Sequence, residues 1–251
     1  MAQGKGILSG GAVAVALCRI RGLSARALRS DGSRLAPGTA VVEIRGDLRR
    51  ILGVERTALN LLMHLSGVAT ATGRAVEAAG GGPGAPRIYA TRKTLPGLRD
   101  LEKSAVRHGG GEPHRRDLSS AVLIKTNHLE FLPIEGAVRK ARASAGRAPI
   151  EVEVRNSSEA LRAVRAGADG VLLDNRSPAQ ARSVIHALDR AGLRDRVWVE
   201  LSGGITPEEA ARYRRTGADA LSLGAITHSA PALPFHLVVR GVRVTRRRRP
   251  S

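Results

Sequence analysis

The 251-residue chain has almost no cysteine and no long apolar run. Cys18 is the only cysteine, so no disulfide can form within the chain, and a reducing compartment is expected. No apolar stretch is long enough to cross a bilayer, and the mildly apolar residues 6–17 lack the cleavage pattern of a signal peptide. These absences predict a cytoplasmic protein with no membrane partner.

Aromatic residues are also rare, at 2% of the chain. Proteins that bind single-stranded nucleic acid stack bases on aromatic side chains, so this class is disfavoured. The net charge of +19 makes nucleic acid a candidate partner, but the arginines are spread along the chain. Their one dense run, at 246–249, is a terminal tail of the kind that is usually solvated. An acidic small-molecule substrate explains the charge more simply.

Lysine is scarce among the 41 Lys+Arg residues and occurs only at Lys5, Lys93, Lys103, Lys125 and Lys140. Arg presents a planar fork to carboxylates and phosphates, whereas Lys presents a compact point charge. Lys93 and Lys125 each follow a short apolar run. We therefore interpret these two lysines as selected for their head group; the alternative is that codon bias left a few lysines at random.

The pattern of apolar residues predicts two regions and an α/β fold. Residues 1–84 are expected to form an N-terminal α/β sandwich layer, with a helix at 11–21, strands at 25–29 and 39–45, and a long helix capped by Asp47. Residues 85–228 alternate six strands with helices, which predicts a parallel sheet in an incomplete α/β barrel. Residues 229–251 lack this pattern and are expected to pack back onto the N-terminal layer. The six strands are expected at 87–90, 121–124, 150–154, 170–173, 197–201 and 220–223, and the helices at 98–107, 133–145, 158–165, 178–189 and 207–215.

Polar side chains mark the predicted strand ends, which meet at one mouth in barrels of this kind. They are Thr91, Arg92 and Lys93 after the first strand, Lys125 after the second, Glu151 and Glu153 in the third, and Asp174 with Asn175 after the fourth. Cations on one side of a mouth and carboxylates on the other predict a pocket for a small polyanion.

The last two strands are followed by Ser202-Gly203-Gly204 and by Gly224-Ala225. Glycine-rich turns at these positions expose backbone N–H groups that can bind a phosphate. The next helix start, at 206–209, has a capping box whose glutamates would repel a phosphate. We therefore expect the anion at the amides of the two glycine-rich loops; the alternative is that the glycines only make tight turns.

Several motifs together carry a family resemblance. They are ERTALN at 55–60, LSGVAT at 65–70, TRKTLPGLRDLEKSAVRHGGG from residue 91, HR at 114–115, LIKTNH, EVEV, GADGVLLDN, SGGIT and GAITHSAPALP. Along nearly its whole length the chain resembles nicotinate-nucleotide pyrophosphorylase, also called quinolinate phosphoribosyltransferase. The resemblance implies an N-terminal α/β sandwich, a barrel with an incomplete strand count, and a homodimer that in some members assembles further. The family's opening helical segment has no counterpart here, so the first layer is expected to be truncated.

The resemblance also implies an activity and its residues. Quinolinate and phosphoribosyl pyrophosphate give nicotinate mononucleotide, pyrophosphate and CO2, usually with Mg2+, in NAD biosynthesis. The implied roles are charge neutralisation of the leaving pyrophosphate by Lys93 and Lys125, and binding of the ribose hydroxyls and Mg2+ by Glu153 and Asp174. Arg92, His114 and Arg115 would bind the quinolinate carboxylates. The remaining substrate-binding positions are Thr91, Ser202, Gly203, Gly204, Leu223, Gly224, Ala225 and Arg56.

Some of these roles have simpler alternatives. Arg56 matches an arginine that the family delivers from the neighbouring subunit, but it could form only a local ion pair with Glu55. His114 could be a loop histidine without a role, and only one of Glu151 and Glu153 need act; the motif match favours Glu153.

Three positions depart from the family pattern. Ala90, Pro113 and Thr126 replace residues that are usually Asp, Asn and Asp. Proline before His-Arg is also common in a related branch, the ModD-like proteins associated with molybdenum transport genes, although the retained Lys125 argues against that branch. A second alternative, from another class, is a non-catalytic binder of phosphorylated ligands or nucleic acid on the same fold.

Overall fold

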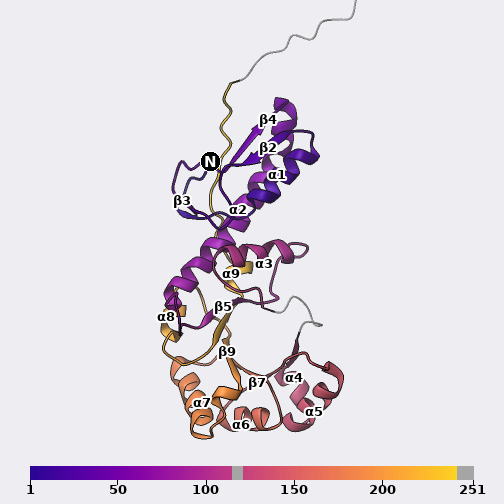
Figure 1. Cartoon of the computed structure of the whole chain (residues 1–251), viewed down its shortest axis with the longest axis vertical. Helices are drawn as coiled ribbons and strands as arrows, with labels where there is room; N and C mark the ends of the chain where they lie inside the picture. The colour runs from indigo at the N-terminus through magenta and orange to yellow at the C-terminus, as the bar shows by residue number, and fades with distance from the viewer. Residues whose placement is uncertain (115–120, 242–251) are drawn as a thin grey trace, which may run out of the picture.

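The computed structural model of the chain describes residues 1–114 and 121–241, and it confirms the α/β architecture expected from the sequence. Figure 1 shows the N-terminal layer at one end of the molecule, the strand–helix repeats at the other, and helix α2 running between them. No helix of the described ranges combines the length and apolarity needed to span a membrane.

The N-terminal layer is built from short elements. They are β1 (Gly6–Ile7), α1 (Gly11–Ile20), β2 (Ser24–Ala27), β3 (Arg34–Leu35) and β4 (Val42–Arg45). Strand β1 pairs with β3 and β2 pairs with β4, both antiparallel. The strand expected at 39–45 begins only at Val42, because Thr39 closes a turn by donating its N–H to the Ala36 carbonyl at 3.1 Å.

Helix α2 (Leu48–Ala79) is the longest element, with 32 residues. The Asp47 side chain accepts a hydrogen bond from the Arg50 N–H at 3.1 Å, which confirms the expected N-cap. The helix ends at Gly80, whose φ of 116° is in the left-handed region that favours glycine.

Six strands form one parallel sheet, as predicted. They are β5 (Arg87–Ala90), β6 (Val122–Ile124), β7 (Ile150–Val154), β8 (Gly170–Asp174), β9 (Trp198–Ser202) and β10 (Ala220–Leu223), in the order β5-β10-β9-β8-β7-β6. The first two strands of this sheet in chain order, β5 and β6, therefore lie at its two edges, and the last, β10, pairs with β5. Beside β5, the N–H of Glu112 donates to the Ile88 carbonyl at 2.8 Å, so the segment around Glu112 extends this edge.

The helices that follow the strands lie outside the sheet (Figure 1). They are α3 (Arg99–His108), α4 (Thr126–Leu129), α5 (Ile134–Ala145), α6 (Ser157–Arg165), α7 (Pro178–Arg190), the 3-10 turn η1 (Arg194–Arg196), α8 (Ala210–Tyr213) and α9 (Ala225–His228). The prediction of a helix at 207–215 is wrong in its length, since only residues 210–213 are helical. Its predicted capping box is present, because Thr206 and Glu209 each bond the other's backbone N–H, at 3.3 and 3.2 Å.

The segment after α9 returns to the N-terminal layer. The Leu233 N–H donates to the Met63 carbonyl at 2.9 Å, and Phe235 forms an antiparallel bridge with Ala2. Leu233 and Phe235 share a buried cluster with Leu8, among others. The arginine run at 246–249 lies outside the described residues.

Candidate active site

A cavity of about 290 Å³ opens at the carboxyl ends of the barrel strands. Its lining residues come from all six strands or from the segments that follow them, which the parallel order brings to one edge. They are Thr91, Arg92, Lys93, His114, Leu123, Lys125, Glu153, Leu172, Asp174, Glu200, Ser202 and Ser222. We call this the mouth cavity. It brings together eight residues singled out from the sequence: Thr91, Arg92, Lys93, His114, Lys125, Glu153, Asp174 and Ser202.

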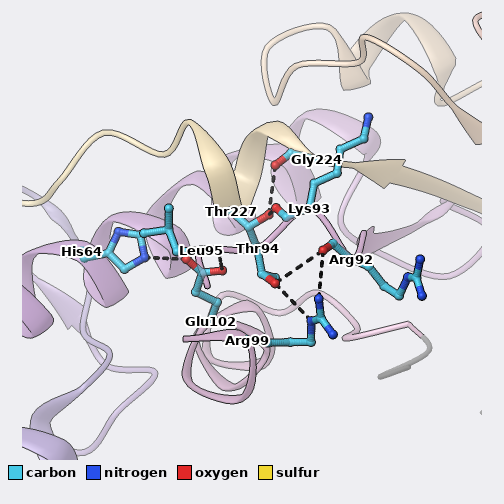
Figure 2. A network of polar contacts seen from close by, with 9 residues as sticks. All are labelled: His64, Arg92, Lys93, Thr94, Leu95, Arg99, Glu102, Gly224 and Thr227. Atoms are coloured by element: carbon cyan, nitrogen blue, oxygen red, sulfur yellow. Dashed lines mark hydrogen bonds and ion pairs between the residues drawn. The ribbon is translucent and has the colours of Figure 1, made fainter. Parts of the chain in front are cut away.

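The cations Arg92 and Lys93 lie on an exposed loop after β5 whose backbone is tied to neighbouring elements. The Thr227 hydroxyl donates to the Lys93 carbonyl at 2.8 Å. Arg99 donates to the Thr94 hydroxyl at 3.1 Å and to the Arg92 carbonyl at 3.4 Å. Figure 2 shows the side chains of Arg92 and Lys93 extending away from these contacts, so the loop is fixed through its backbone while the charged groups project outward.

Two carboxylates line the same cavity. One oxygen of Glu153 accepts a hydrogen bond from the Thr126 hydroxyl at 2.9 Å, and one oxygen of Asp174 accepts from the Asn175 side chain at 2.7 Å. Thr126 occupies a position where the resembled family usually has Asp. Here a neutral donor replaces a third carboxylate, so the site has one negative charge fewer and Glu153 gains a hydrogen bond.

His114 is held at the inner end of the cavity. Its Nε2 lies 3.0 Å from a Glu200 oxygen, and the other Glu200 oxygen accepts from the Ser222 hydroxyl at 2.5 Å. An ionised Glu200 accepts from Nε2 and so favours the tautomer of His114 that carries its proton there. His114 has a φ of 51°, which non-glycine residues rarely adopt, so the loop is held against its backbone preference. This arrangement argues against a loop histidine without a structural role.

Tyr89 packs beneath His114, with ring centroids 5.1 Å apart, and stacks on Trp198 at 5.8 Å. Burial raises the pKa of the Tyr89 hydroxyl to about 12, and the charge of Glu112 acts in the same direction. Tyr89 therefore stays neutral near pH 7; it lines the cavity at the opposite end of the barrel, and His114 lines both cavities.

The two glycine-rich loops flank the mouth. Gly203 has a φ of 91°, and a Cβ there would come within 2.5 Å of Asn175, so only glycine fits. A Cβ on Gly224 would meet the Lys93 side chain at 3.1 Å, so this loop lies directly beside the cationic loop. The Leu223 side chain is fully buried, so any contact of Leu223 with an anion would use its backbone. Gly204 and Ala225 lie in the same two loops.

Two residues named from the sequence, Arg56 and Glu151, lie elsewhere, and a third is not described. Arg56 is an exposed residue of α2 and does not line the mouth cavity. Arg115 lies outside the described residues. Glu151, grouped with Glu153 from the sequence, instead lines a second cavity of about 530 Å³ at the amino ends of the strands. The expectation that both glutamates lie at the mouth is wrong for Glu151, because the two residues share a face of β7 but differ in depth.

One group of side chains has the spacing of a metal site. The ligand atoms of His114, Glu151 and Glu200 lie within 4.8 Å of one another. Glu153 and Asp174, the pair expected to hold Mg2+, are a separate pair of carboxylates at the mouth. Oxygen donors of this kind suit Mg2+, but two carboxylates fill only part of its octahedral shell, so the rest would come from substrate oxygens and water.

Sequence reasoning missed Glu200, Ser222 and the contacts that fix the cationic loop. Glu102, which is fully buried, lies 2.7 Å from His64 and accepts the Leu95 N–H at 3.1 Å. A signal was present, because Glu102 occupies a position of α3 between Leu98 and Ala105 that the helical period turns toward the core.

Comparisons with known proteins point to one family along nearly the whole chain. Residues 1–66 match the family model described as quinolinate phosphoribosyl transferase, N-terminal domain, and residues 68–238 match the C-terminal domain of the same family. The chain is 44% identical over 241 residues to a probable nicotinate-nucleotide pyrophosphorylase [carboxylating] of Methanothermobacter thermautotrophicus, covering 95% of this chain and 86% of that protein. It is 41% identical over 209 residues to the Homo sapiens nicotinate-nucleotide pyrophosphorylase [carboxylating], covering 82% and 70%.

The solved structure of NadC from Streptococcus pyogenes superposes with a TM-score of 0.85 at 38% identity, covering 93% of this chain and 81% of that one. The two family models meet within α2, whereas the domain boundary expected from the sequence, at 84/85, lies after this helix. That boundary stays a prediction.

The matches cover nearly all of the described residues and include both the N-terminal layer and the barrel. The chain belongs to the quinolinate phosphoribosyltransferase family.

Proposed function

We propose that this chain is a quinolinate phosphoribosyltransferase of NAD biosynthesis. It transfers the phosphoribosyl group of phosphoribosyl pyrophosphate to the ring nitrogen of quinolinate, forms nicotinate mononucleotide, and releases pyrophosphate and CO2. The observation that carries the proposal is the mouth cavity, where Arg92, Lys93 and Lys125 share one lining with Glu153 and Asp174. Both substrates are polyanions and the reaction passes through a cation-like ribosyl centre, so it needs both signs of charge in one cavity. We place the activity in the cytoplasm, since Cys18 is a buried free thiol.

The residues at the mouth suit a division of labour. Arg92, His114 and Arg115 bind the two carboxylates of quinolinate, because Arg offers paired donors and His114 is held by Glu200. Lys93 and Lys125 neutralise the negative charge that develops on the leaving pyrophosphate. Backbone N–H groups of the loops at 202–204 and 223–225 bind phosphate oxygens.

Mg2+ is the metal ion that we propose for this site. Glu153 and Asp174 would hold it, together with oxygens of phosphoribosyl pyrophosphate, and the ion would neutralise phosphate charge. The two carboxylates also lie where negative charge favours a cationic ribosyl centre, and we propose that they bind the ribose hydroxyls. The support is their common place in the mouth cavity and their oxygen-only donor set.

We further propose a homodimer in which Arg56 enters the partner's mouth cavity. Arg56 is exposed on α2 and lies outside the mouth cavity of its own chain, as a residue that acts on a second copy must. Mixing Arg56→Ala and Arg92→Ala proteins tests this, because one site of each mixed dimer would regain both arginines. Activity should rise from near zero to about a quarter of the wild-type level in a C2 dimer. Mixtures that stay as inactive as the two parents would contradict the exchange.

The activity itself is tested by mass spectrometry. Purified protein with quinolinate, phosphoribosyl pyrophosphate and Mg2+ should produce nicotinate mononucleotide and CO2 in equal amounts, and quinolinate labelled with 13C at the 2-carboxylate should release labelled CO2. A ModD-like enzyme would consume phosphoribosyl pyrophosphate with a different acceptor and ignore quinolinate. A non-catalytic binder would shift its melting temperature with these ligands but form no product.

A further inference from the structure

The carboxylate of Glu102 is buried in helix α3 with a relative exposure of 0%. One oxygen lies 2.7 Å from Nε2 of His64 on α2, and the other accepts the backbone N–H of Leu95 at 3.1 Å. Figure 2 shows Glu102 between these two partners. Both oxygens of a fully buried carboxyl group therefore have a partner, one on helix α2 and one in the loop after β5.

Leu95 lies in the loop that carries Arg92 and Lys93 and that connects β5 to α3. The Thr227 hydroxyl and the Arg99 guanidinium hold the carbonyls of Lys93 and Arg92 from other directions. Glu102 accepts the backbone N–H of Leu95, two residues beyond Lys93, and it is the only carboxylate drawn in this network (Figure 2). The loop is thus tied by its backbone at three residues, while its two cationic side chains project toward the mouth cavity.

Folding alone does not explain a carboxyl group at this buried position. Replacing both partners of a buried polar pair by well-packed apolar side chains is often neutral or stabilising, so an apolar pair at residues 64 and 102 would serve the packing of α2 and α3 as well. A leucine could not accept the Leu95 N–H, however. A hydrogen-bond acceptor is needed at residue 102 to hold the backbone N–H of Leu95 and so to fix the position of the loop.

We propose that Glu102, oriented by His64, is a positioning residue that fixes Arg92 and Lys93 at the mouth of the active site. The inference rests on the proposed function for its catalytic consequence. A shift of about 1 Å in a group that contacts the reacting atoms can reduce the rate about 100-fold. Loss of this one acceptor therefore affects turnover well beyond its effect on stability.

Three variants separate placement from folding. Glu102→Leu keeps the side-chain volume and removes the acceptor, so kcat/KM should fall by about 100-fold. Glu102→Gln keeps an acceptor for the Leu95 N–H and can donate to His64 in its other tautomer, so it should recover most of that loss. Val106→Ala, at another fully buried position of α3, is the matched control for a destabilised helix. Loss of activity in Val106→Ala equal to that in Glu102→Leu would overturn the proposal, as would Glu102→Gln as inactive as Glu102→Leu.

Two further measurements keep the test independent of the reaction. Hydrogen–deuterium exchange at the Leu95 amide should accelerate in Glu102→Leu and stay near the wild-type rate in Glu102→Gln; equal protection in all three proteins would overturn the proposal. Glu102→Leu should also cost far less in an Arg92→Ala background than alone, because the two residues act as one unit. If the losses of activity from Glu102→Leu and Arg92→Ala simply add in the double variant, the two residues are not coupled and the proposal is contradicted. If the wild-type protein makes no nicotinate mononucleotide, the proposed function fails, while the exchange result still decides whether Glu102 holds the loop.

Discussion

The two ends of the barrel carry cavities that differ in size and in charge. The cavity at the amino ends of the strands measures about 530 Å³, against about 290 Å³ for the mouth cavity. Within the described part of the chain, the larger cavity is lined by aromatic and acidic side chains without Lys or Arg, whereas Arg92, Lys93 and Lys125 line the smaller one. Each cavity has three acidic residues in its lining, so the three cations of the mouth cavity, rather than volume, identify the end that binds a polyanion. The predictions below test this contrast.

The largest effect is expected from Arg92→Ala. Removal of a fixed positive group from a site that binds anionic reactants typically costs about 100- to 1000-fold in turnover. Steady-state rates with quinolinate should therefore drop by that amount, while thermal unfolding stays close to wild type because Arg92 is exposed. The control at the opposite end is Glu112→Gln, which removes a charge from the larger cavity and should change kcat/KM less than twofold. Equal losses in both variants would refute the contrast.

Asp174→Asn and Glu153→Gln should have the next largest effect. Each change keeps the shape of the side chain and removes one negative charge, so the affinity for Mg2+ falls together with the support for the ribosyl cation. We expect a loss of about 100-fold in kcat and a higher Mg2+ concentration for half-maximal rate. Initial rates measured across a Mg2+ titration check both parts. An unchanged Mg2+ dependence would remove these residues from the metal site.

Thr126→Val is a milder change at the mouth. Valine has nearly the same shape but cannot donate to Glu153, and a hydrogen bond to a charged group contributes about 1.5 kcal/mol or more. We expect kcat/KM to fall about tenfold, with Thr126→Ser restoring most of the rate. If valine and serine behave alike, the hydroxyl has no part in holding Glu153.

The smallest effect concerns the amino end and involves no catalysis. Tyr213→Phe leaves Tyr89 as the only tyrosine, so ultraviolet titration of that variant should report an ionisation near pH 12. The folded pKa is raised above the unfolded value of about 10. The contribution of Tyr89 to stability is therefore complete below pH 10 and declines as pH rises between about 10 and 12. Adding Glu112→Gln should lower this pKa, because the Glu112 charge opposes ionisation.

Much of the fold could be predicted from local sequence. The strands β5, β7 and β10 have the predicted limits, because short apolar runs bounded by polar residues fix where a buried strand begins and ends. Several residues at the mouth followed from the same reasoning, since parallel strands bring their carboxyl ends together; they are Thr91, Arg92, Lys93, Lys125, Glu153, Asp174 and Ser202.

Depth and tertiary pairing could not be predicted in this way. Glu151 and Glu153 point to the same face of β7, but two residues of strand separate them by about 7 Å, enough to place them in different cavities. The contact of His64 with Glu102 joins residues 38 positions apart, so no local pattern reports it. Periodicity gives the face of an element, whereas partners across the core depend on how whole helices pack.

Helix α2 contributes residues to all three buried apolar clusters of the described residues. Moving along it, Val54 packs in the cluster beneath β2, Leu59 and Leu62 in the cluster that includes Leu8, and Val68 in the large cluster of the barrel. Unfolding of α2 beside any of these clusters would expose apolar side chains of that cluster to water. The layer and the barrel should therefore denature as one calorimetric unit, and a protease should find no cleavage point within α2 that releases a stable fragment.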